Sequence, residues 1–194
     1  TAVKRLRKLN QRTKIVRGGS SAGKTIAILC ILIDYAIRHE NKEISIVSES
    51  IPHLRRGALK DFLAIMKGLR RYKEKQFNRS TLKYEFSTGS YIEFFSTDQP
   101  DKLRGARRTD LYINECNNVP FSSYQELSIR TSENIWLDYN PTSLFWVDKE
   151  LIGQSDTDFI TLTYKDNESL PESIVNELEK ARVKAKTSSY WKNW

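Results

Sequence analysis

The stretch Gly18-Gly19-Ser20-Ser21-Ala22-Gly23-Lys24-Thr25 decides the fold class of this 194-residue chain. It matches the pattern G-x-x-x-x-G-K-[S/T], in which glycines allow a tight turn and let backbone N–H groups wrap a phosphate. The lysine of such a loop reaches the β- and γ-phosphates of a nucleotide, and the hydroxyl that follows it binds Mg²⁺. Residues 18–25 therefore predict a nucleotide-binding loop.

The sequence on both sides of this loop supports the prediction. Residues 14–16 form an apolar stretch typical of a short strand, and residues 26–37 are apolar nearly all round, as in a buried helix. A helix that starts at the loop directs the positive end of its dipole at the phosphates. The alternative is a glycine- and serine-rich turn that matches the pattern by chance.

The rest of the chain alternates between strand and helix patterns. Residues 52–70 and the segment from Pro171 show helical spacing of apolar residues. The turn at residues 87–90 predicts a β-hairpin between its two flanking strands. Strands are expected at residues 43–47, 81–86, 91–95, 111–113, 134–139 and 159–164. This order predicts a three-layer α/β fold with a mostly parallel central sheet and helices on both faces.

Composition limits the class of protein. The chain is 39% hydrophobic and 11% aromatic, which is ordinary for a folded domain, and its length suits a single domain over residues 1–194. Its net charge of +8 favours a polyanionic partner such as nucleic acid, although a solvated basic surface is an equal alternative. Cys30 and Cys116 form no disulfide framework and no metal-binding spacing, so we expect a reducing cytoplasm. Residues 26–37 are too short to span a bilayer, and no signal peptide is seen.

A second candidate site lies where the strand expected at residues 111–113 ends in Asn114-Glu115. In hydrolytic proteins with this kind of loop, such a strand ends in Asp-Glu. There the Asp holds Mg²⁺ through water, and the Glu polarises the attacking water. Asn114 carries no charge, so we expect it to hold the metal more weakly, through a water that hydrogen-bonds to its amide oxygen. Glu115 is the candidate base. The alternative is a strand that ends in two solvated polar residues.

Two further segments could contact phosphates. Arg104, Arg107 and Arg108 surround Gly105 just before that strand, and they suit a γ-phosphate, a DNA backbone or a merely solvated loop. Asn140 follows another strand and could sense the γ-phosphate or hydrogen-bond the attacking water. Asn140-Pro141 is also ordinary turn sequence. The basic residues 4–8 are either a solvated helical turn or a phosphate contact.

Taken together, the order and spacing of four segments resemble the large terminase subunit of tailed bacteriophages. These segments are residues 16–25, residues 103–115, residues 137–142, and residues 163–171 with 188–194. The resemblance implies an N-terminal ATPase domain of the additional-strand, conserved-glutamate type, with ATP and Mg²⁺ as cofactors. In that family a nuclease domain follows. We expect residues 165–194 to lead toward it, so the chain would be a fragment without nuclease activity.

The resemblance also implies roles for individual residues. Residues Gly18, Gly19, Ser20, Ser21, Ala22, Gly23, Lys24 and Thr25 would form the Walker A loop, with Thr25 and Asn114 at the metal and Glu115 as the catalytic base. Asn140 and Thr142 would belong to the segment that couples hydrolysis to movement. Asn10 and Gln11 sit where the family places its adenine contact, and Arg17, Arg104 and Arg107 are candidates for stabilising charge at the γ-phosphate. The family pattern expects Asp where this chain has Asn114.

The function that the resemblance implies is ATP hydrolysis that drives double-stranded DNA into a procapsid in the host cell cytoplasm. Its partners would be DNA, the capsid portal protein and the small terminase subunit, without any membrane. We expect a homo-oligomeric ring on the capsid and a monomer in isolation. The alternatives are a helicase or recombination ATPase, and a nucleotide-gated DNA-binding module with little hydrolysis.

Overall fold

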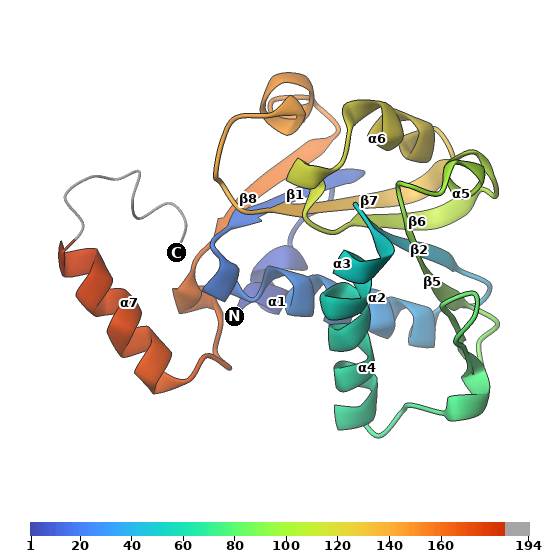
Figure 1. Cartoon of the computed structure of the whole chain (residues 1–194), viewed down its shortest axis with the longest axis horizontal. Coiled ribbons are helices and arrows are strands. Elements are labelled where there is room, and N and C mark those ends of the chain that lie inside the picture. The colour runs from blue at the N-terminus through green and yellow to red at the C-terminus, as the bar shows by residue number, and fades with distance from the viewer. Residues whose placement is uncertain (185–194) are drawn as a thin grey trace.

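A computed structural model describes residues 1–184 of the chain, so the part of the resemblance at residues 188–194 lies outside the described residues. Its centre is an eight-stranded sheet with the strand order β3-β4-β5-β2-β6-β7-β1-β8 (Figure 1). The six strands from β5 to β8 in that order are parallel, and β3 and β4 extend one side in antiparallel fashion. The strands are β1 (Thr13–Gly18), β2 (Glu43–Ser48), β3 (Phe77–Asn78), β4 (Lys83–Glu85), β5 (Tyr91–Ser96), β6 (Arg108–Ile113), β7 (Thr131–Tyr139) and β8 (Thr157–Leu162).

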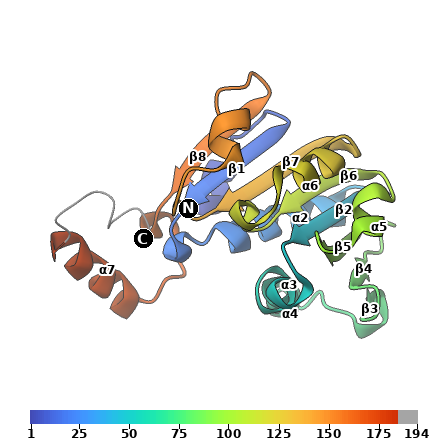
Figure 2. The same cartoon turned by 45° about the horizontal axis from the view of Figure 1, so that its top comes forward.

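Helices cover both faces of this sheet (Figures 1 and 2). One core joins the sheet to α1 through α4, and a second core on the opposite face joins it to α5, α6 and a π-helical turn at Val147–Leu151. The helices are α1 (Ala2–Leu6), α2 (Lys24–Arg38), α3 (Ile51–Arg56), α4 (Ala58–Gly68), α5 (Pro100–Arg104), α6 (Phe121–Ser128) and α7 (Glu172–Lys184). The three-layer fold with a mostly parallel sheet is thus confirmed.

Helix α2 is the apolar helix expected after the loop. With the helical turn before it, the 19-residue run Ser20–Arg38 is long and apolar enough to cross a membrane by length and composition alone. Seven residues of α2 are nevertheless buried, and α2 packs against β1, β7, α1 and α4. The burial of its apolar side chains against the sheet accounts for the hydrophobicity of the run.

The helix predicted over residues 52–70 is instead two helices. Gly57 stands between α3 and α4 with φ −101° and ψ −110°, far from helical values. Ser50 caps the first turn of α3 by accepting a hydrogen bond from the His53 N–H. His53, on α3, lies beside Glu115, the second residue after β6.

The predicted hairpin is present between β4 and β5. Its turn uses Gly89 at φ +76°, a conformation that favours glycine. β4 is shorter than the strand expected over residues 81–86, because Leu82 has φ +53° and leaves the strand. The short elements α5 and β3 were not predicted, since one helical turn or two strand residues carry no periodic signal. Helix α1 overlaps the helical turn that was one of the two expectations for residues 4–8.

The parallel strands define two edges of the sheet. β1, β6 and β7 all end at one edge, here named the carboxyl edge, and all begin at the other, named the amino edge. Six residues of parallel strand span about 20 Å. Residues that precede these strands are therefore separated from residues that follow them by the height of the sheet.

Candidate nucleotide-binding site

The glycine-rich loop lies at the carboxyl edge, where β1 ends at Gly18. A Cβ atom at Gly18 would lie 2.3 Å from the Leu162 carbonyl oxygen of β8, so only glycine fits there. Gly23 has φ +71° and immediately precedes α2. The Asn167 amide donates to the Ser21 carbonyl at 3.0 Å and holds the loop from outside. The first backbone N–H groups of α2 therefore point toward the space above the loop.

The Lys24 side chain closes over this loop. Its Nζ donates to the carbonyl oxygens of Gly18 at 2.8 Å and Gly19 at 3.1 Å, and to Asn140 Oδ1 at 2.8 Å. Burial lowers the pKa of Lys24, and the carboxylates of Asp138 and Glu115 oppose that shift. The amine is held where the phosphate oxygens of a nucleotide would compete with these three acceptors.

A cavity of about 180 Å³ lies between this loop and the ends of β6 and β7. Thr25, Glu115 and Asn140, three residues that the sequence singled out, line this cavity. The structure therefore brings these predicted residues together with Lys24. The cavity is lined by Ser20, Gly23, Lys24, Thr25, Ile26, Asp61, Glu115, Asp138 and Asn140.

The Asn114 amide is oriented differently from our expectation. Its Nδ2 donates to Asp138 Oδ1 at 3.0 Å and approaches Thr25 Oγ1 at 3.4 Å. An ionised carboxylate only accepts hydrogen bonds, so the nitrogen and not the oxygen of this amide faces Asp138. Its Oδ1 instead lies toward Gly57, where a Cβ atom would be 3.6 Å away. Asn114 thus presents a donor to Thr25, not the acceptor expected for a metal-bound water.

Asp138, at the end of β7, was not among the predicted site residues. It is 1% exposed, and its Oδ1 accepts hydrogen bonds from the Tyr112 hydroxyl, the Asn114 amide and the Glu115 backbone N–H, each at 3.0 Å. Burial raises the pKa of Tyr112 well above its ordinary value, so that hydroxyl keeps its proton. The available signal was a carboxylate two residues before Asn140 at the end of an apolar strand.

Glu115 is held on two sides. Its backbone adopts φ +53° and ψ +55°, which is uncommon for a residue with a side chain. The hydrogen bond from its backbone N–H to Asp138 Oδ1 fixes this conformation. Its Oε2 lies 3.0 Å from His53 Nε2 on α3. Both side chains remain partly exposed. The sequence did not reveal His53, because its contact with Glu115 joins two segments that are far apart in the chain.

Arg104 and Arg107 lie at the other end of β6. Both are exposed, and they precede the first residue of that strand at the amino edge, where α5 also ends (Figure 1). Their neighbour Arg108 is buried and donates to Ser45 Oγ and to the Leu127 and Ala106 carbonyls. Arg108 therefore has a structural role. The structure does not bring Arg104 or Arg107 to Lys24 of the same chain.

Asn10 and Gln11 are also at the amino edge. Their backbone N–H groups donate to Asp158 Oδ2 at 2.6 and 2.8 Å, just before β1 begins. The length of β1 separates them from the glycine-rich loop, so the structure does not place them at a shared site with it. A hollow of about 190 Å³ instead adjoins the loop at Gly23. It is lined by Thr1, Ala2, Val3, Gly23, Ile26, Ala27, Asp166, Asn167, Glu168 and Ser169.

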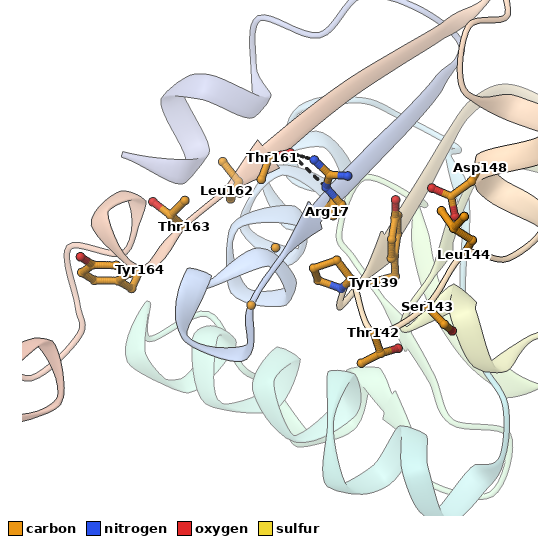
Figure 3. A pocket seen from close by; sticks show the side chains of 13 residues that line it. Arg17, Tyr139, Thr142, Ser143, Leu144, Asp148, Thr161, Leu162, Thr163 and Tyr164 are labelled. Atoms are coloured by element: carbon orange, nitrogen blue, oxygen red, sulfur yellow. Dashed lines mark hydrogen bonds between the residues drawn. The ribbon is translucent and has the colours of Figure 1, made fainter. Parts of the chain in front are cut away.

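Arg17 points into a different hollow, of about 420 Å³, between β8 and the segment that follows β7 (Figure 3). Its guanidinium donates twice to Thr161 Oγ1, at 3.2 and 3.1 Å, and lies 4.9 Å from the centre of the Phe159 ring. Thr142 lines the same hollow. Arg17 is thus next to the glycine-rich loop but outside the cavity that contains Lys24.

The cavity suits a divalent ion with few protein ligands. Within residues 1–184 no cluster of three or more His, Cys, Asp or Glu side chains could hold a metal by itself. Mg²⁺ retains several waters and is usually bound by one or two protein oxygens together with substrate phosphates. The Thr25 hydroxyl and the nearby carboxylates of Asp138 and Glu115 fit that type of binding.

Comparison with known families decides the relationship. The model of the family described as phage terminase large subunit matches residues 10–193. The chain belongs to this family. The predicted P-loop NTPase fold is also confirmed by solved terminase structures. No curated protein matched the chain.

Three solved structures are similar to this terminase chain. The large terminase of a thermophilic bacteriophage aligns with a TM-score of 0.76 and 20% identity, over 97% of this chain and 50% of its own. The same phage's enzyme in complex with ATP-γ-S aligns with a TM-score of 0.74 and 20% identity, over 97% and 49%. The large terminase ATPase domain of Thermus phage P74-26 aligns with a TM-score of 0.71 and 13% identity, over 100% and 91%. The chain spans about half the length of the first of these proteins.

Proposed function

We propose that this chain is the ATP-hydrolysing motor domain of a viral large terminase, which moves double-stranded DNA into a procapsid. Family membership and the cavity at the carboxyl edge support this function. The observation that carries the proposal is the convergence of Lys24, Thr25, Glu115 and Asn140 on one cavity. A similar terminase from a thermophilic phage has been solved in complex with ATP-γ-S, which supports a nucleotide as the ligand.

The residues around the cavity have different roles in phosphoryl transfer. Backbone N–H groups of the loop and the Lys24 amine bind the phosphates, and Mg²⁺ bound with the nucleotide neutralises charge on their oxygens. Glu115 orients the attacking water and accepts its proton. His53 fixes the Glu115 carboxylate, and the Asn140 amide, between Lys24 and Ser20, contacts the γ-phosphate.

We propose a location for the nucleotide base other than the one expected at Asn10 and Gln11. The hollow beside Gly23 adjoins the loop and the first turn of α2, so it accepts the base and ribose of a nucleotide whose phosphates lie on the loop. DNA contacts are to phosphates and therefore independent of sequence, in keeping with the net charge of +8.

Arg104 and Arg107 are proposed to act on the nucleotide of a neighbouring subunit. They are exposed at the amino edge, a strand length from their own Lys24. An arginine supplied in trans is worth ~10³- to 10⁵-fold in rate, so an isolated monomer hydrolyses ATP slowly. Mixing an Arg104→Ala chain with a Lys24→Ala chain restores turnover in part, and Arg107→Ala is tested in the same way. Activity that does not depend on concentration, with no rescue from either mixture, points to Arg17 in the same chain.

The function is tested by ATP turnover with and without nucleic acid. We expect slow hydrolysis that rises with double-stranded DNA and on docking to the capsid portal in the host cytoplasm, with the small terminase subunit as a further partner. Stimulation by single-stranded DNA alone would favour a helicase. Tight ATP binding without phosphate release would favour a nucleotide-gated module. We also expect no metal-dependent nicking of plasmid by this chain.

A further inference from the structure

Asp138 lies where the site needs a negative charge. The residue that follows β6 is Asn114, which is neutral, and its amide directs a donor at Thr25. β6 and β7 are neighbouring parallel strands, and Asp138 is next to the end of β7. The Asn114 nitrogen lies within hydrogen-bond reach of both Thr25 Oγ1 and Asp138 Oδ1. The carboxylate of Asp138 is therefore close to the hydroxyl expected at the metal.

One oxygen of Asp138 is available to a ligand. All three of its hydrogen bonds reach Oδ1, while Oδ2 accepts none from the residues that the structure describes. The side chain is 1% exposed, yet the residue lines the cavity that holds Lys24, Thr25 and Glu115. Because Asp138 lines the cavity, its Oδ2 is free to accept hydrogen bonds from water or from a ligand there.

We propose that Asp138 takes the place of the carboxylate that Asn114 lacks, and that its Oδ2 accepts hydrogen bonds from waters bound to the nucleotide's Mg²⁺. This inference rests on the proposed function, because the metal arrives with the nucleotide. The negative charge has moved from the end of β6 to the end of the neighbouring strand β7. Asn114 then fixes the orientation of this carboxylate and does not bind the metal itself.

A purely structural role for Asp138 makes a different prediction. If the carboxylate served only to accept hydrogen bonds from Tyr112, Asn114 and Glu115, its replacement would weaken nucleotide binding with and without metal alike. A metal-binding role predicts different changes in nucleotide affinity with metal and without it. Without metal, removal of a negative charge near the phosphates leaves nucleotide affinity unchanged or tighter; with metal, affinity falls.

The test compares ATP-γ-S affinity over a series of Mg²⁺ concentrations in the unmodified chain and in Asp138→Asn. The Asn side chain keeps an oxygen that can accept the three hydrogen bonds. In Asp138→Asn, we expect the Mg²⁺ concentration that gives half of the maximal change in ATP-γ-S affinity to rise roughly 10- to 100-fold. A loss of this size is typical when a group that hydrogen-bonds to the ligands of a metal is removed. Mn²⁺ binding followed by electron paramagnetic resonance in the presence of ADP should weaken by a similar factor.

Two further variants make the test specific. In Asn114→Asp with Asp138→Asn the charge returns to β6, and we expect the Mg²⁺ dependence to recover to within several-fold of the unmodified chain. Asp110→Asn is the matched control, since Asp110 is also 1% exposed and accepts from an asparagine amide, but at the amino edge. Its Mg²⁺ dependence should not change. Circular dichroism confirms that each variant is folded.

The possible outcomes are distinguishable. An unaltered Mg²⁺ dependence in Asp138→Asn, or an equal loss of affinity with and without metal, overturns the role of Asp138 and leaves the proposed function standing. Failure of the unmodified chain to bind ATP-γ-S at any Mg²⁺ concentration overturns the proposed function, and the inference with it.

Discussion

The two edges of the sheet contain the same kinds of side chain in similar contacts. At the amino edge, the buried Lys14 donates to Asn134 Oδ1 at 2.9 Å, and Asn134 Nδ2 donates to Asp110 Oδ1 at 2.8 Å. At the carboxyl edge, the buried Lys24 likewise donates to an asparagine, and a buried aspartate likewise accepts from an asparagine amide. Burial lowers the pKa of both lysines.

The difference between the edges is what surrounds these contacts. Lys14 also donates to the Gln11 carbonyl and lies over the Trp136 ring, and Asp110 Oδ2 is sealed in the interior. Lys24 instead lies beside the start of α2 and a cavity of about 180 Å³. The types of side chain and their hydrogen bonds therefore do not by themselves identify a binding site. A helix N-terminus and open space turn a buried polar network into a place for a ligand.

The largest effect is expected from Glu115→Gln. Loss of the base should reduce ATP hydrolysis by ~10²- to 10⁴-fold, while ATP-γ-S affinity stays within a few-fold. Glu133→Gln is the control, because this carboxylate is of similar exposure but binds Lys42 and Tyr35 on the amino-edge side. Turnover and nucleotide affinity are measured on both. Hydrolysis by Glu115→Gln at the unmodified rate would contradict the assignment of the base.

The next largest effect is a difference between the two edges in how Mg²⁺ with nucleotide changes the stability of a variant. Asn114→Asp would set two carboxylates about 3 Å apart, which disfavours ionisation of one of them and destabilises the fold without metal. Mg²⁺ with nucleotide should more than restore the stability and raise or preserve hydrolysis. Asn134→Asp makes the same kind of pair with Asp110 at the amino edge. Thermal unfolding with and without Mg²⁺ and ADP should show rescue only for Asn114→Asp, and equal rescue would contradict the comparison.

A smaller effect is expected from His53→Gln. His53 holds the Glu115 carboxylate at 3.0 Å, so its loss should lower kcat by about 2- to 10-fold, the worth of one hydrogen bond, and leave KM unchanged. Arg56→Gln, on the same short helix and exposed, serves as the control. A change in KM with kcat unaltered would show that His53 acts on nucleotide binding and not on Glu115.

The smallest effect concerns stability near the amino edge. Hydrogen bonds from Lys42 and Tyr35 lower the pKa of Glu133 below its ordinary value. Its stabilising contribution is therefore present above the unfolded-state pKa and is lost as pH falls through the folded-state pKa. Because the pair is partly exposed, we expect less than about 1 kcal/mol. Urea unfolding should show a smaller acid-induced loss of stability between about pH 5 and pH 3 in Glu133→Gln. An identical pH profile would contradict this.

Three residues predicted from the sequence alone come together at one cavity in the structure. Lys24, Thr25 and Glu115 could be predicted because fixed spacing and strand ends define their positions. Asn10, Gln11 and Arg104 could not be placed, since their distance from the loop depends on which edge each strand starts from. His53 could not be predicted either, because its contact with Glu115 depends on how α3 packs beside the end of β6.

Asp138 was missed for another reason. No motif requires an acidic residue at this position, and the neutral Asn114 does not indicate which other residue supplies a carboxylate. That information exists only in the pairing of β6 with β7, which sets the ends of the two strands side by side. Likewise, the sequence showed Arg17 next to the loop but not the direction of its side chain toward Thr161.

The central claim is that the carboxyl edge, and not its chemical counterpart at the amino edge, binds the nucleotide. The most direct measurement compares ATP-γ-S affinity in Mg²⁺ for Lys24→Met and Lys14→Met by titration calorimetry, on chains shown to be folded. Loss of a charged hydrogen bond to phosphate should weaken Lys24→Met by about 10- to 100-fold, while Lys14→Met should stay within about twofold of the unmodified chain. Unchanged binding by Lys24→Met, or an equal loss in both variants, would contradict the account.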